Sequence, residues 1–333
     1  MSENVRKAKQ ISMLEHAKKK SMWSGSKNAQ TIESYVLSTD NEDGLIFIKK
    51  DLKYPPALLK IIDETIVNAI DHHTHFSNKV TDIKISLDND GTISVYNNGP
   101  GIPVEKTTNI NGIEMYTPQL IASEFLAGDN LDDIGDNIKG GTNGIGLKLV
   151  SAFSKSLNLT TLDSNNGLLY SQTFKNGLTQ IDPPNIEKVN KKSQSYTCIS
   201  FMPDYEEFKL DNKEFHHTLN ELLKTRAWQA AAFTSAKVYY NNSLIKLNSF
   251  SDFCQMFSEN IVFETYMTDN SKYKWDVCLS VSDGKEQTIS IINGVYIPKG
   301  GTHIQHIQNQ IIANLKDKVE KEIKKSGVKF NKN

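Results

Sequence analysis

The sequence predicts an α+β protein with two domains, and three observations support this fold class. Residues 57–71 carry apolar side chains at helical spacing. Residues 83–95 and 275–292 alternate apolar and polar side chains, as half-buried strands do. The chain of 333 residues is longer than one typical domain. Helical and strand-like runs in mixed order over this length indicate the α+β class.

The predicted elements follow one another with short turns between them. In chain order they are an arm with a short helix to about residue 40, a helix at 57–71, a hairpin at 83–95, a helix at 118–126, a helix from the glycine-rich loop through 157, strands between 159 and 203, a helix at 213–232, a hairpin at 237–247, strands at 275–281 and 287–292 joined by 282–284, and a helix through about 323. Pro55 and Pro56 fit the start of the first long helix, where proline is tolerated. We place the two domains at residues 1–248 and 249–333.

The most informative segment is the glycine-rich loop from Lys139 to Lys148. It has four glycines in seven residues, followed by a lysine at the start of a predicted helix. Glycine lets backbone N–H groups approach an anion, and a helix start adds free N–H donors and a positive dipole end. Leu147 separates the last glycine from Lys148, so the loop is not a Walker A motif, and the third glycine of a Rossmann loop is missing. The segment is a phosphate-binding loop of another kind.

Polar residues line one side of the 57–71 helix. Glu64, Asn68 and Asp71 recur at i, i+4 and i+7, opposite the apolar face. A carboxylate can deprotonate a water, and a carboxamide oxygen one turn away suits Mg²⁺. An ordinary solvated helix face explains the same spacing, so the helix alone does not decide the function.

A second polar motif follows the 83–95 hairpin. The strand leads into Asn97, Asn98 and a glycine-rich turn that contains Gly101 and Ile102. The carboxamide of Asn98 offers both a donor and an acceptor, which suits the edge of a purine. A polar loop of turn-forming residues is the alternative interpretation.

Composition excludes several classes of protein. The net charge is −1, and no apolar run approaches membrane-spanning length or the core of a signal peptide. Three scattered cysteines (Cys198, Cys254 and Cys278) give no disulfide framework, which favours a reducing, intracellular compartment. His72, His73 and His75 lack a partner cluster at zinc-site spacing, so we do not predict a zinc site.

Taken in order, these motifs resemble the GHKL ATPase superfamily, and most closely the ATPase region of eukaryotic-type DNA topoisomerase II. The matching segments are Leu14–His16, Asp63–Ala69, Asn97–Pro103, Gly140–Lys148, Tyr196–Asp204 and Lys299–His303. The run from His16 to Trp23 is more similar to the topoisomerases of large DNA viruses. The resemblance covers nearly the whole chain. It implies a GHKL (Bergerat) sandwich of helices on a mixed sheet, followed by a smaller α/β transducer domain.

The resemblance also implies ligands and residue roles. Glu64 would be the general base that activates the attacking water, Asn68 would bind Mg²⁺, and Asn98 would contact adenine. The ATP-binding residues that it implies are Asn68, Asp71, Asn98, Gly101, Ile102, Asn130, Gly141, Thr142, Asn143, Gly144, Ile145, Gly146, Leu147 and Lys148. Such roles agree with phosphoryl transfer, in which positioning and charge stabilisation dominate catalysis.

The sequence departs from the family at several positions. Gly128 and Asp129 stand where cellular enzymes carry two serines, and Thr142 replaces a common arginine. The family also has a Gln-Thr-Lys loop whose lysine contacts the γ-phosphate, and the sequence stops at Asn333 before such a motif. If that is the true end, we expect weak or absent hydrolysis with nucleotide binding retained.

The function implied by the resemblance is an ATP-operated gate. ATP would close a homodimer around a double-stranded DNA segment, and the cleavage core would belong to a longer protein. We expect an intracellular location, in the nucleus or, for a viral protein, at cytoplasmic replication sites. Candidate DNA-contacting lysines are at 18–20, 191–192 and 316–325. The alternatives are a MutL-type or chaperone-type clamp and a histidine-kinase-type phosphotransfer enzyme.

Overall fold

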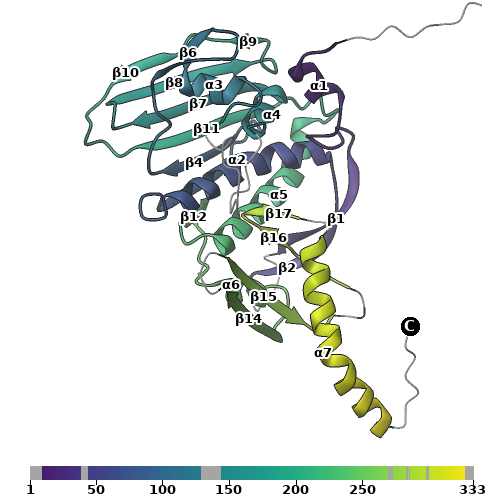
Figure 1. Ribbon diagram of the computed structural model, residues 1–333. Helices are drawn as coiled ribbons and strands as arrows, with labels where there is room; N and C mark the ends of the chain where they lie inside the picture. Colours follow the sequence, from purple (N-terminus) through teal and green to yellow (C-terminus); the bar gives the residue numbers. More distant parts are fainter. Residues whose placement is uncertain are drawn as a thin grey trace, which may run out of the picture. The chain divides into compact units, whose positions relative to one another are not determined.

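The computed structural model describes residues 10–38, 44–128, 144–268, 273–282, 284, 286–297 and 300–326. The chain divides into two compact units, Met1–Val281 and Ser282–Asn333, which are described separately (Figure 1). The predicted domain boundary at residue 249 stays a prediction. In the described part of the chain, no helix is both long and apolar enough to cross a membrane.

The first unit contains most of the secondary structure. Its helices are α1 (Met13–Lys19), α2 (Pro56–His75), α3 (Thr117–Ser123), α4 (Gly146–Ala152), α5 (Asn212–Phe233) and α6 (Phe250–Gln255). Its strands are β1 (Gln30–Ser38), β2 (Ile46–Tyr54), β3 (Asp82–Leu87), β4 (Ile93–Asn98), β5 (Lys106–Thr108), β6 (Glu114–Tyr116), β7 (Ser154–Asp163), β8 (Leu168–Lys175), β9 (Gln180–Ile181), β10 (Asn185–Lys188), β11 (Tyr196–Pro203), β12 (Lys237–Tyr240), β13 (Ser243–Leu244), β14 (Ile261–Met267) and β15 (Lys274–Ser280). The second unit contains β16 (Ile291–Ile292), β17 (Val295–Tyr296) and α7 (Thr302–Ser326).

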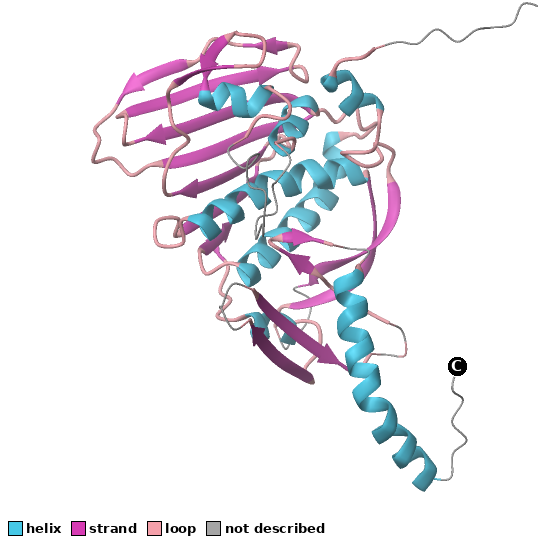
Figure 2. Ribbon diagram, in the orientation of Figure 1, coloured by secondary structure: helices cyan, strands magenta, loops and turns pink. Residues whose placement is uncertain are grey.

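A nine-stranded mixed sheet organises the first unit. The strand order is β10-β8-β7-β11-β4-β3-β12-β13, with β9 paired to β8. The pairing of β12 with β3 is parallel, whereas β4, β11 and β7 pair antiparallel at the centre. Helices and strands pack together in this unit, which confirms the predicted α+β class (Figure 2).

Helices cover one face of this sheet. Alternate residues of the central strands, among them Ile93, Val95, Leu157 and Leu159, are less than 5 % exposed. Helix α2 contacts β4, α4 contacts β7, and α5 contacts β3 and β12. Helices α2 and α5 lie side by side beneath the sheet (Figure 1). The polar face of α2 is therefore held by an apolar core on its other sides.

Three predicted elements are wrong in part. The helix predicted at 118–126 ends at Ser123, because Glu124 is extended and Leu126 adopts a φ of 62°. The helix after the glycine-rich loop ends at Ala152 and not at Leu157, because β7 begins at Ser154 and buries Leu157 and Leu159 with a period of two. Strand β15 pairs with β14, which the sequence did not indicate, and places Trp275 opposite Tyr266. Within the strand predicted at 287–292, residues Ile291–Ile292 form β16, which pairs with β17. The predicted helices at 57–71 and 213–232 are confirmed as parts of α2 and α5.

Candidate functional site

Helix α2 presents the predicted polar face. Ile62, Ile66 and Ile70 are fully buried, whereas Glu64 and Asn68 are half-buried. Apolar residues at helical spacing anchor the helix through its other side. The carboxylate and the carboxamide therefore lie one turn apart at the border of the core.

Glu64 is held between two neighbours. Its carboxylate forms an ion pair with Lys60, one turn earlier on α2, and its side chain is 13 % exposed. It also lies against Gly146, the first residue of α4, where an added Cβ would sit 2.8 Å from the carboxyl carbon of Glu64. Only glycine leaves room for the carboxylate at this contact. The helix and the glycine-rich loop, 82 residues apart in the sequence, therefore meet at Glu64.

Asn68 lies one turn further along the same face. Its carboxamide makes no hydrogen bond with any described residue, so its oxygen is open to a ligand. A hard cation that keeps several waters and binds substrate phosphates needs only one or two such oxygens from the protein. The residues present here fit Mg²⁺. The described residues hold no cluster of three or more His, Cys, Asp or Glu side chains for a metal held by the protein alone.

Three central strands place a polar row on the helix-facing side of the sheet. Asn97 of β4 pairs with Thr197 of β11, which pairs with Thr161 of β7. Directly opposite residues of antiparallel strands share a face. The next row on this face is apolar and consists of Val95, Ile199 and Leu159. A polar row beside an apolar one marks the end of the core at this side of α2.

Asn97 connects this row to α2. It is 6 % exposed, and its Nδ2 donates to Nδ1 of His72 at 2.7 Å. Because the amide nitrogen is a donor, the ring nitrogen accepts, which places the ring proton of a neutral His72 on Nε2. Asn97 belongs to the predicted motif, but the predicted purine contact is Asn98, and Asn97 has no predicted role. The signal was present, since residues 93, 95 and 97 share a face of a strand with period two.

Asn98 points to the opposite face and is saturated with hydrogen bonds. Its Oδ1 accepts from the backbone N–H groups of Thr81 and Asp82 at 2.8 and 2.9 Å. Its Nδ2 donates to Thr81 Oγ1 and Asp82 Oδ2 at 2.8 and 3.1 Å. With 3 % exposure, this side chain fixes the start of β3.

The turn after β4 folds back onto β7. The backbone N–H of Ile102 donates to Thr161 Oγ1 at 2.9 Å. A Cβ at Gly101 would lie 2.7 Å from the carbonyl carbon of Leu162, so the backbone packs where a larger residue does not fit. Gly101 and Ile102 thus cover the polar row of Thr161.

The glycine-rich loop is described only at its end. Asn130, Gly141, Thr142 and Asn143 lie outside the described residues. Gly144 adopts a φ of 58°, and its carbonyl accepts from Leu126 N–H at 3.1 Å. Ile145 precedes the seven-residue helix α4 without a side-chain cap.

Two residues of α4 that were predicted to bind ATP are buried. Leu147 is 6 % exposed and belongs to the core. Lys148 is 2 % exposed, and its ammonium donates to the carbonyl oxygen of Ala127. The lysine therefore anchors the segment that comes before the loop.

A buried ion pair that the sequence reading did not find lies behind Glu64. Arg226 of α5 donates from Nε to Asp63 Oδ1 at 2.5 Å, and its Nη1 donates to Gln229 Oε1 at 2.5 Å. Asp63 and Arg226 are 8 % and 2 % exposed. The two residues lie 163 positions apart in the sequence, and no local pattern indicates the pair.

His73 has a structural role. Its Nδ1 bonds the carbonyl oxygen of Val80 at 2.7 Å, and its Nε2 bonds Ser235 Oγ at 3.0 Å. With both nitrogens bonded, His73 ties the end of α2 to β3 and to the end of α5.

Comparisons with known proteins identify the family. Residues 53–182 match the family described as histidine kinase-, DNA gyrase B-, and HSP90-like ATPase, and residues 246–333 match the DNA gyrase B family. DNA topoisomerase 2 of Penicillium chrysogenum is 32 % identical over 96 % of this chain and 20 % of its own length. DNA topoisomerase 2 of Acanthamoeba polyphaga mimivirus is 33 % identical over 92 % of this chain and 24 % of its own length. The chain thus spans about a fifth to a quarter of these relatives.

Comparison with solved structures points to the same family. The ATPase region of Saccharomyces cerevisiae topoisomerase II superposes with a TM-score of 0.83 at 30 % identity, over 94 % of this chain and 81 % of that one. The ATPase and transducer domains of DNA topoisomerase II from Balamuthia mandrillaris superpose with a TM-score of 0.83 at 27 % identity, over 95 % of this chain and 78 % of that one. The chain belongs to the family of the ATPase and transducer regions of type II DNA topoisomerases.

Proposed function

We propose that this chain binds and hydrolyses ATP and acts as the nucleotide-operated gate of a type II DNA topoisomerase. The contact of Glu64 with Gly146 carries this proposal, because it brings a carboxylate to the end of the glycine-rich loop, where α4 begins. Family membership supports the same conclusion. Binding of ATP would close a homodimer around a double-stranded DNA segment, and the cleavage core of the longer protein would pass the strand.

Glu64 is the proposed general base. Its carboxylate takes a proton from the water that attacks the γ-phosphorus, while the leaving ADP departs on the far side. The ion pair with Lys60 and the contact with Gly146 restrict the rotamers of Glu64. Restriction of this kind matters because a misplacement of about 1 Å can cost roughly 100-fold in rate.

Asn68 is the proposed protein ligand of Mg²⁺. When bound, the ion would neutralise charge on the phosphate oxygens. The open carboxamide oxygen of Asn68 supports this assignment. Asp71, one turn further along α2, stays a predicted ATP-binding residue.

The purine contact moves from Asn98 to Asn97 in our proposal. Asn98 has used both its donors and its acceptor on Thr81 and Asp82. Asn97 faces the helices beside Thr197 of the neighbouring strand β11, and its Oδ1 has no hydrogen bond with a described residue. A carboxamide oxygen in that position can accept from the exocyclic amine of adenine.

The phosphates would lie against the end of the glycine-rich loop. Backbone N–H groups of Gly144, Ile145 and Gly146 are the described candidates, together with the predicted residues Gly141, Thr142 and Asn143. Lys148 bonds the carbonyl of Ala127, so its contact with phosphate requires a rearrangement of that anchor. Asn130 stays a predicted contact to the ribose or phosphate.

A matched pair of variants tests the site. We expect Asn97→Ala to weaken the binding of a non-hydrolysable ATP analogue with Mg²⁺, measured by titration calorimetry, and to lower the thermal stability modestly, because His72 and the carbonyl of Asn98 lose a donor. Asn98→Ala should lower the stability further, because the backbone donors of Thr81 and Asp82 lose their buried acceptor. Equal analogue affinity for Asn97→Ala and wild type would contradict the purine contact.

Glu64→Gln tests the chemistry. It keeps the shape and removes the base, so we expect retained analogue binding and a turnover lower by about 100-fold to 10,000-fold. Light scattering with and without the analogue measures closure of the gate. A monomer in both conditions, with analogue binding intact, would contradict the dimerisation step.

A further inference from the structure

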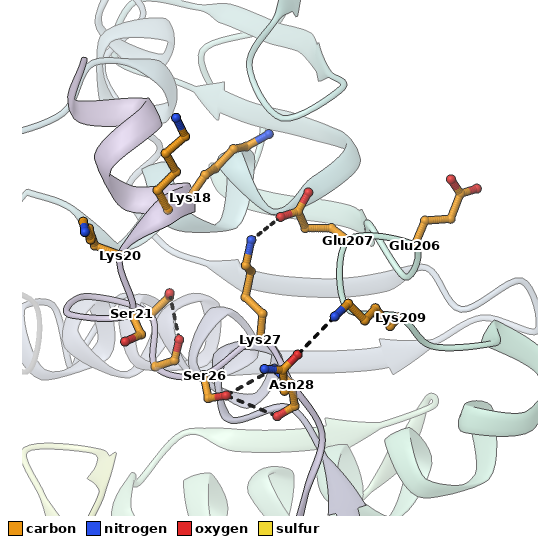
Figure 3. A pocket seen from close by; sticks show the side chains of 12 residues that line it. Lys18, Lys20, Ser21, Ser26, Lys27, Asn28, Glu206, Glu207 and Lys209 are labelled. Atoms are coloured by element: carbon orange, nitrogen blue, oxygen red, sulfur yellow. Dashed lines mark hydrogen bonds and ion pairs between the residues drawn. The ribbon is translucent and has the colours of Figure 1, made fainter. Parts of the chain in front are cut away.

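A basic hollow lies between the end of α1, the start of β1 and the turn before α5. It encloses about 520 Å³ and is lined by Lys18, Lys19, Lys20, Ser21, Ser24, Gly25, Ser26, Lys27, Asn28, Glu206, Glu207 and Lys209. Figure 3 shows Lys18, Lys20, Lys27 and Lys209 around the hollow. Five lysines and two glutamates give this surface a net charge of +3. This charge contrasts with the net charge of −1 for the whole chain.

Two of the lysines are neutralised by carboxylates. Lys27 pairs with Glu207 at 2.5 Å across the hollow (Figure 3), and Lys19 pairs with Glu15 on its own helix at 2.5 Å. The ammonium of Lys209 donates to the amide oxygen of Asn28 at 3.4 Å and has no carboxylate partner within the described ranges. The Lys27 pair is 36 % and 30 % exposed, so a competing anion can reach it.

The other two lysines have no carboxylate partner among the described residues. Lys18 and Lys20 make no ion pair or side-chain hydrogen bond with the described part of the chain. The ammonium of Lys18 packs against the bare backbone of Gly177, where an added Cβ would displace it, and Lys18 is half-buried, whereas Lys20 is exposed. Neither ammonium is neutralised by a carboxylate of the described residues.

Neutral donors lie beside the lysines. The hydroxyl of Ser21 has no hydrogen bond with a described residue, and Ser26 uses its hydroxyl on the backbone of Asn28. Ammonium and hydroxyl donors around an open hollow match phosphate oxygens, which accept from several donors at once.

We propose that this hollow binds the phosphate backbone of double-stranded DNA through Lys18, Lys20 and Lys209, with Lys27 joining when Glu207 is displaced. The choice of DNA as the source of phosphate rests on the proposed function, whereas the charge and the open donors do not. The contact reads no sequence, because only backbone phosphates are bound. It adds a DNA-contacting surface outside the nucleotide site.

The magnitude follows from counterion release. Each lysine–phosphate contact contributes about 0.9 to the steepness with which the logarithm of the DNA association constant falls with the logarithm of the salt concentration. At roughly 0.1 M salt, the loss of one contact therefore lowers the affinity about eightfold. Lys18→Gln with Lys20→Gln should therefore weaken DNA binding by about 60-fold and lower the slope by about 1.8. Fluorescence anisotropy with a labelled duplex, without nucleotide, measures both quantities.

A charge-matched control isolates the hollow. Lys49→Gln with Lys106→Gln removes the same charge from lysines that pair with Glu33 and Glu114 elsewhere on the surface. We expect less than about a twofold change for this control. Equal losses for the two double variants would overturn the proposal, as would the absence of duplex binding by the wild-type chain at low salt.

Glu207→Gln tests whether Lys27 can bind phosphate once it is released from Glu207. Freeing this lysine should tighten DNA binding by up to about eightfold. Glu187→Gln makes the same change in net charge on β10 and should have a smaller effect. Equal effects of the two variants would remove Lys27 from the site.

Two further measurements separate this proposal from the function proposed above. Titration of the ATP analogue should be unchanged in the Lys18/Lys20 double variant, so loss of DNA binding alone supports the hollow. If nucleotide binding fails while the DNA effect persists, the gate proposal fails and the hollow stands. The second measurement adds inorganic phosphate to the duplex titration at matched ionic strength. If phosphate competes with the duplex, and the Lys18/Lys20 variant and the control bind the duplex equally, the hollow binds a small phosphate and the DNA contact is overturned.

Discussion

Replacement of Arg226 by methionine should strongly destabilise the first unit. Arg226 is 2 % exposed and pairs with Asp63, which is 8 % exposed. Methionine fills a similar apolar volume, so the main effect is the carboxylate left buried without its partner. Because Asp63 precedes Glu64 in α2, the pair also fixes the helix that carries the proposed base.

The expected size follows from the burial of both partners. Removal of one partner from a buried ion pair costs about 3–5 kcal/mol. For a unit of this size, about 2–4 °C per kcal/mol converts this loss to a melting temperature lower by roughly 6–20 °C. Exposed pairs contribute below about 1 kcal/mol. Lys106→Met, which breaks the exposed pair of Lys106 with Glu114, is therefore the control.

Thermal and urea unfolding followed by circular dichroism measure the loss. Asp63→Leu combined with Arg226→Met removes both charges and should recover most of the stability, since buried pairs replaced by apolar residues are often neutral. The reasoning would be refuted if Arg226→Met lowered the unfolding free energy by less than about 1 kcal/mol. It would also be refuted if the loss in the double variant equalled the sum of the losses in the two single variants.

Three further outcomes are expected. Gly146→Ala should displace the Glu64 carboxylate and lower ATP turnover by about 100-fold, while stability changes by less than about 1 kcal/mol because alanine favours a helix; unchanged turnover would contradict the role of their contact. Burial and the charge of Asp90 raise the pKa of Tyr205, so its stabilisation is complete below the unfolded pKa of 10.0 and is lost as pH rises above it; Tyr205→Phe should flatten the decline of the unfolding free energy at alkaline pH, and an unchanged slope would contradict this. Burial raises the pKa of the Cys254 thiol, so a thiol reagent followed by mass spectrometry should label it only after unfolding, and labelling of the folded chain would contradict its packing.

Local patterns were enough to predict much of the fold. The long helices α2 and α5 and the β3–β4 hairpin follow from hydrophobic period and turn residues, which act within a few residues. The end of α4 was missed because Leu149 to Leu157 satisfies a helical pattern and also begins a strand. Only pairing with β8 and β11, which come later in the chain, decides between the two.

The site was predictable in its elements but not in its contacts. The sequence indicated the polar face of α2 and the glycine-rich loop. The choice between Asn97 and Asn98 for the proposed purine contact depends on which of these two successive residues of β4 faces the helices. Long-range partners left no trace in the sequence, as Arg226 with Asp63 illustrates. Lys148 was expected at the phosphates, because its place beside the glycines gives no sign that its ammonium donates a hydrogen bond to the carbonyl oxygen of Ala127.

The parallel pairing of β12 with β3 bears on how the chain folds during synthesis. Asp82 of β3 pairs with Lys237 of β12, so 155 residues separate the two partners. At about 5–20 residues per second, a ribosome needs roughly 8–30 s to supply the second strand. During that interval β3 is an unpaired edge, which invites association with other chains. Nascent chains of this protein should therefore depend on chaperone protection until residue 240 has emerged.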